Sequence, residues 1–78
     1  MDREYGNARY STCKVEDPSE GYVGFDLLRS QSGKKDRVAR ILFWDADGQF
    51  SLETCGTDVP LGILEELIAE AKGSMKAD

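Results

Sequence analysis

The chain has 78 residues, a formal net charge of −5, two cysteines and no histidine. This length allows one small domain, and the absence of histidine and of any Cys-x-x-Cys pair argues against a zinc site. The negative balance disfavours direct binding to DNA or RNA, since phosphate contacts need clustered lysine and arginine.

The N-terminal residues carry no apolar signal region, and no stretch approaches the roughly 20 apolar residues that cross a bilayer. We therefore expect a cytoplasmic protein that does not enter a membrane, with Cys13 and Cys55 as reduced thiols. A single Cys13–Cys55 bridge is the alternative. In a simple four-strand meander the two residues would lie at opposite edges, too far apart for the roughly 7 Å limit between bridged Cα atoms.

In chain order, residues 1–9 are polar and without periodicity, so we expect a loose arm. Residues 10–16 alternate in character and predict the first strand. The Asp-Pro-Ser-Glu-Gly turn follows at 17–21, where proline fixes φ and glycine tolerates a chain reversal. Alternation resumes over residues 22–31, which predict the second strand.

A second turn at residues 32–35 leads to the third strand, residues 36–44, which is apolar on both faces. The Asp-Ala-Asp-Gly segment at 45–48 is typical of a hairpin. Alternation over residues 50–55 predicts the fourth strand, which Gly56 ends.

The period then changes to that of a helix. Pro60 suits the first turn, and Lys72 and Gly73 suit the last turn and the C-cap. Between them the apolar residues recur at steps of three and four, opposite the glutamates: Leu61, Leu64, Leu67, Ile68 and Ala71 against Glu65, Glu66 and Glu70. Residues 74–78 are expected to be a frayed tail.

The predicted fold is therefore a single α+β domain over residues 1–78, a four-stranded antiparallel β-meander with one C-terminal α-helix on one face (ββββα). The phase with almost no charge is assigned to the core under the helix: Cys13, Val15, Val23, Phe25, Leu27, Ala39, Ile41, Phe43, Phe50 and Leu52. The other phase forms an open face: Tyr10, Thr12, Lys14, Tyr22, Asp26, Leu28, Val38, Arg40, Leu42, Trp44, Ser51 and Glu53.

No catalytic pattern stands out. The cysteines lack a histidine that could act as a base, and Glu65 and Glu66 are adjacent on the helix and so point apart. Asp45-x-Asp47-Gly48 lacks the spacing of a calcium loop and is explained by a hairpin turn. We expect a protein that is not an enzyme and holds no metal or cofactor.

A resemblance rests on residues 37–50, which read RVARILFWDADGQF, together with VPL at 59–61 and LEELIAEA at 64–71. In this C-terminal half the chain resembles a group of small uncharacterised proteobacterial proteins with a sheet-plus-helix fold. In size, acidity and lack of chemistry it is also similar in type to phage and mobile-element inhibitors, including anti-CRISPR proteins. Neither resemblance implies particular site residues.

Tryptophan, tyrosine and arginine are enriched at binding hot spots, which makes the open face the candidate for contact with another protein or a second copy of the chain. Acidic residues on the helix would steer a cationic partner, such as a protein with a nucleic-acid channel. The candidate partner-binding residues are Trp44, Leu42, Arg40, Tyr22, Leu28, Val38, Glu65, Glu66 and Glu70.

Three interpretations stay open. The first is a non-enzymatic interaction module, in its most specific version an inhibitor that blocks a nucleic-acid-binding complex. The second is a bacterial accessory domain that associates with itself through the open face. In the third, polar neighbours simply cover that face, and it binds nothing.

Overall fold

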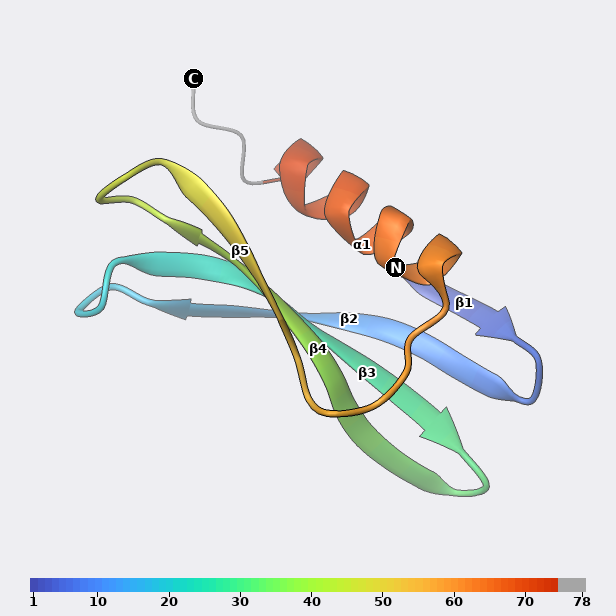
Figure 1. The fold of residues 1–78 in the computed structure, drawn as a ribbon. Helices are drawn as coiled ribbons and strands as arrows, with labels where there is room; N and C mark the ends of the chain where they lie inside the picture. Colours follow the sequence, from blue (N-terminus) through green and yellow to red (C-terminus); the bar gives the residue numbers. More distant parts are fainter. Residues whose placement is uncertain (75–78) are drawn as a thin grey trace.

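A computed structural model describes residues 1–74 as one antiparallel sheet with a helix across one of its faces (Figure 1). The strands are β1 (Asp2–Tyr5), β2 (Ala8–Asp17), β3 (Tyr22–Gln31), β4 (Lys34–Trp44) and β5 (Gln49–Thr54), and the helix is α1 (Leu61–Ser74). The strands lie side by side in chain order. The α+β class and the meander are confirmed, but the sheet has five strands where four were predicted.

The additional strand, β1, lies in the segment expected to be a loose arm. Tyr5 pairs with Ala8 across a two-residue turn, and Gly6 has the positive φ of 63° that short hairpin turns favour. Side chains then fix the strand, since Arg3 contacts Glu66 at 2.6 Å. The expectation of a loose arm was wrong because contacts with the helix, rather than alternation, hold this polar segment.

Helix α1 follows Pro60, whose carbonyl oxygen accepts the backbone N–H groups of Ile63 and Leu64 at 3.0 and 3.1 Å. The helix runs through Gly73 to Ser74, so the C-cap expected at Gly73 was wrong. The rest of the predicted tail, residues 75–78, lies outside the described residues.

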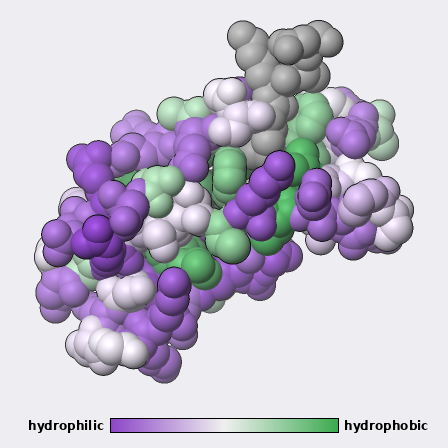
Figure 2. All heavy atoms as spheres, turned by 180° about the vertical axis from the view of Figure 1, so that it is seen from behind, coloured by the Kyte–Doolittle hydropathy of each residue, from purple (hydrophilic) through white to green (hydrophobic). Residues whose placement is uncertain are grey.

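The core lies between α1 and the middle strands. Nine hydrophobic residues are buried there: Ala8, Tyr10, Leu27, Val38, Ala39, Ile41, Ile63, Leu67 and Ala71. The three helical members recur at four-residue steps, so one stripe of the helix meets the sheet. Seen from behind, hydrophobic residues gather in the middle of the molecule between hydrophilic ends (Figure 2).

The predicted phase of β2 was wrong. Tyr10 is buried in the core, and the Thr12 hydroxyl donates to Glu70 of α1 at 3.0 Å, so both face the helix. Cys13 is exposed, and Val15 lies with it on the far side of the strand. The burial of the large Tyr10 ring and the Thr12–Glu70 hydrogen bond decide which residues of β2 face the helix. The small apolar side chains of Cys13 and Val15 do not decide it.

A β-bulge in β4 corrects the placement of Val38. The register pairs Leu27 with Ala39 but Leu28 with Arg37, so Val38 is the extra residue. Its side chain is 1% exposed and belongs to the core, as does that of Ala39. Strict alternation placed Val38 on the open face because it does not allow for two successive inward residues.

Within residues 1–74, the helix lies closest to β3 and β4, and its approach to β5 is weaker. Leu52 of β5 shares the helix side with Ile41, its register partner, yet it is 42% exposed. Its predicted place in the core was therefore wrong. Phe50, closer to the turn, packs on Phe43 with ring centroids 5.0 Å apart and stays half-buried.

Candidate partner-binding face

The sheet face opposite α1, here the open face, is built of five rows of side chains that run across the strands. The register gives the rows as Glu4–Arg9–Ser30–Lys35, Asp2–Ser11–Leu28–Arg37, Cys13–Asp26–Arg40–Glu53, Val15–Gly24–Leu42–Ser51 and Asp17–Tyr22–Trp44–Gln49. They follow from alternation, since the residues between them face the helix.

An aromatic pair closes one end of the open face. The Tyr22 and Trp44 rings meet edge to face, with centroids 5.2 Å apart and an angle of 64° between planes. The Trp44 indole N–H donates to the Ser51 hydroxyl at 2.9 Å, which fixes the ring against β5. Both rings are half-buried by one another and keep an accessible surface.

In the next row, the Leu42 side chain lies against Gly24, its register partner on β3, which has no side chain. An ideal Cβ on Gly24 would stand 1.9 Å from the Ile41 carbonyl oxygen and 2.9 Å from the Leu42 Cδ2 atom. Glycine at this position allows the close approach of β4. Leu42 therefore continues the apolar surface that Trp44 and Tyr22 begin.

An ion pair divides the open face. Arg40 donates from Nε and Nη2 to the two Asp26 oxygens at 2.5 and 3.1 Å, a bidentate geometry. The two side chains are 25% and 16% exposed, and Arg37 adds a longer contact to Asp26 at 3.9 Å. The hydrogen bond to Asp26 raises the pKa of Arg40 above its ordinary value, so the guanidinium stays charged.

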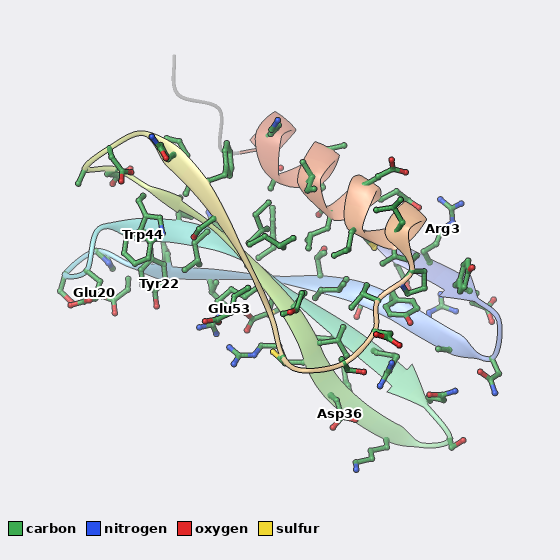
Figure 3. All side chains as sticks on the ribbon, in the orientation of Figure 1. Arg3, Glu20, Tyr22, Asp36, Trp44 and Glu53 are labelled. Atoms are coloured by element: carbon green, nitrogen blue, oxygen red, sulfur yellow. The ribbon has the colours of Figure 1, made fainter. Side chains whose placement is uncertain are left out.

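Acidic turns flank the aromatic pair. The Asp45 N–H donates to the Gly21 carbonyl at 3.0 Å, which holds the β2–β3 and β4–β5 turns together. In the first turn, hydrogen bonds from the Ser19 hydroxyl and the Glu20 N–H keep the pKa of Asp17 below its ordinary value. Figure 3 shows Glu20 beside Tyr22 and Trp44 at this end of the sheet.

The two ends of the sheet carry opposite charge. The acidic end holds Glu16, Asp17, Glu20, Asp45 and Asp47. The first residues of β4, at the other end with Asp36 (Figure 3), include Lys34, Lys35 and Arg37. A cationic partner is therefore attracted to the aromatic end in particular.

The structure brings together part of the predicted set. Trp44, Tyr22 and Leu42 form one apolar surface beside Arg40, whereas Leu28 lies beyond the Asp26–Arg40 pair. Val38 is buried, so its inclusion as a contact residue was wrong.

The helical glutamates lie away from the open face. Glu66 contacts Arg3, and Glu70 contacts the α-amine of Met1 at 3.0 Å and the Thr12 hydroxyl. Glu65 is exposed on α1. Two of the three glutamates thus hold the N-terminal strand against the helix.

Sequence reasoning left several residues of this face out of the site. Ser51 orients Trp44, and Asp26 holds Arg40; both were expected on the face but not as parts of the site. Val15 was assigned to the core. Its cross-strand partner is Gly24. The pairing of a valine with a glycine next to Leu42 was the signal that could have placed Val15 on the open face.

Within residues 1–74 no three histidine, cysteine, aspartate or glutamate side chains are grouped so that they could hold a metal ion. Cys13 and Cys55 are both free and exposed. None of the described helical segments is long and apolar enough to cross a membrane.

Comparison with known proteins identifies no relative: no family model, no curated protein and no solved structure matches the chain.

Proposed function

We propose that this protein is a non-enzymatic protein-binding module whose open face docks a basic surface of a partner protein. The observation that carries the proposal is the apolar surface of Trp44, Tyr22 and Leu42 beside two adjoining acidic turns. In the part of the chain that the structure describes, the helix lies on the other sheet face and no element covers this one.

The chemistry of this end suits a lysine- or arginine-bearing segment. Aromatic faces attract cations, most strongly those of tryptophan and tyrosine. The acidic turns raise the local concentration of a basic partner and speed its approach. The Arg40–Asp26 pair is internally neutralised, so it adds hydrogen-bonding groups without repelling a basic segment.

The test compares variants as bait for partner capture. The double change Trp44→Ala with Leu42→Ser removes the apolar surface, and Leu61→Ser is the matched control because Leu61 is 71% exposed on the helix. We expect the double variant to lose a partner that wild type and control retain. Equal capture by all three, with each variant folded by circular dichroism, would rule out the open face.

Electrostatic steering needs a different set of changes. Reversing Glu66 or Glu70 would break contacts with the N-terminal strand. Glu16, Glu20 and Asp45 make no ion pair within residues 1–74 and can be changed to lysine together. We expect slower association and a weaker salt dependence; an unchanged association rate would refute steering.

The acidic end supports a more specific second proposal, in which the partner is a nucleic-acid-binding complex and this chain is an inhibitor of the phage type. The carboxylates at the two turns would then occupy the positive surface that binds phosphates. Competition decides it: a nucleic acid should displace this chain from its partner. Simultaneous binding of both would contradict inhibition by occupancy.

A further inference from the structure

Within residues 1–74, the backbone groups on the outer edge of β5 have no partner strand. The Cys55 N–H donates to the Val38 carbonyl at 3.1 Å, so residue 55 and, by alternation, residues 53, 51 and 49 turn their backbone toward β4. Phe50, Leu52 and Thr54 therefore turn their N–H and C=O groups outward. Leu52 and Thr54 are exposed, and β5 is the last strand of the sheet.

The opposite edge of the sheet is protected against pairing. Strand β1 has only four residues, three of them charged, and its side chains form ion pairs with Arg9 and with the helix. Charges of this kind keep an edge strand from pairing with another chain. Strand β5 has no lysine, arginine or proline, and its single charged residue, Glu53, turns its backbone inward.

From this contrast we propose that β5 pairs antiparallel with β5 of a second copy of this chain, about a two-fold axis at Leu52. Leu52 then faces Leu52 of the second copy, and Phe50 faces Thr54. All three residues with outward backbone groups become hydrogen-bonded pairs. The two sheets join into one continuous sheet.

This register also places compatible side chains opposite one another across the contact. The exposed Leu52 side chains cover one another on the helix side. On the open face, Ser51 stands opposite Glu53 of the second copy. The Ser51 oxygen already accepts the Trp44 N–H, so its own proton is available to that carboxylate. No two like charges face each other directly, and both open faces remain free on the same side of the joined sheet.

Proline at position 54 tests the contact. Proline lacks only the outward N–H here, so the β4–β5 ladder keeps its hydrogen bonds. We expect wild type and Thr54→Val to sediment as dimers and Thr54→Pro as a folded monomer. A wild-type monomer at the highest attainable concentration, or a Thr54→Pro chain that still dimerises, would overturn the proposal.

A cross-link tests the register directly. In the proposed pair, residue 49 stands opposite Cys55 of the second copy at a non-hydrogen-bonded position, with Cα atoms about 4.5 Å apart. This separation lies within the range of about 4.4–6.8 Å that disulfides span. Cys55 is exposed and free.

The experiment uses a Cys13→Ser background, which leaves Cys55 as the single thiol. Adding Gln49→Cys should give a covalent dimer on mild oxidation, and the background alone and the neighbouring change Asp47→Cys should not. Residues 49 and 55 of one chain lie at opposite ends of β5, so they cannot bridge internally. Absence of the dimer with Gln49→Cys, or equal cross-linking in the controls, would contradict this register.

Discussion

Replacing Gly24 with alanine adds one methyl group where the structure has no space. Its carbon would stand 1.9 Å from the Ile41 carbonyl oxygen, about 1.5 Å short of ordinary contact. The nearest neighbour is a backbone atom, so β3 and β4 must separate or bend. We expect a loss of about 2–3 kcal/mol of unfolding free energy, at the upper end of what overpacking costs. For a domain of this size that is a large part of a total unfolding free energy of about 3–5 kcal/mol.

Urea denaturation followed by Trp44 fluorescence measures this loss. With a slope near 1 kcal/mol per molar urea, the midpoint should fall by about 2–3 M. Gly62→Ala is the control, since its added carbon meets no atom within 4 Å. Helix propensity should make that variant more stable by up to about 1 kcal/mol. A Gly24→Ala midpoint within about 0.5 M of wild type would refute the close approach of the two strands.

Three further predictions follow from side-chain contacts. A double-mutant cycle of Asp26→Ala and Arg40→Ala should give a coupling of about 1–2 kcal/mol in the free energy of unfolding, below that of a fully buried pair. A coupling near zero would show that the bidentate contact does not stabilise the fold. The lowered pKa of Asp17 means that its ionised form favours folding above the ordinary aspartate value of about 3.9 and that this contribution is lost on acidification. The difference in unfolding free energy between wild type and Asp17→Asn should therefore become smaller below about pH 4. A difference that grows on acidification would contradict a lowered pKa of Asp17. Glu70→Gln should speed hydrogen exchange of the β1 amides and leave those of β3 unchanged, because Glu70 holds the N-terminal strand; equal rates in β1 would contradict that role.

Most of the elements were predictable from local chemistry. The turn at Asp17–Gly21, the Asp47-Gly48 hairpin and the helical period after Pro60 each depend on a few neighbouring residues, and the structure has an element boundary or helix at each. Strand β1 was not predictable in this way. Its residues are polar, and contacts with residues far along the chain, such as Glu66, hold it in place.

The candidate face was predictable in β3 and β4 away from the bulge. Tyr22, Leu42 and Trp44 lie between the bulge and the acidic turns and share one face as predicted. At the bulge, Val38 turns inward, because a bulge adds a residue that strict alternation does not allow for. Glu70 was assigned to steering because its partners, Thr12 and the Met1 amine, lie at the other end of the chain.

The central claim, that the open face contacts a partner, is tested most directly by a photoreactive side chain placed on that face. A benzophenone amino acid at position 22 replaces one ring of the aromatic pair, and the same group at position 61 reports on the exposed helix surface. After irradiation in cells, we predict a covalent adduct with a basic protein from position 22 and none from position 61. An adduct from position 61 alone, or none from position 22, would contradict the claim.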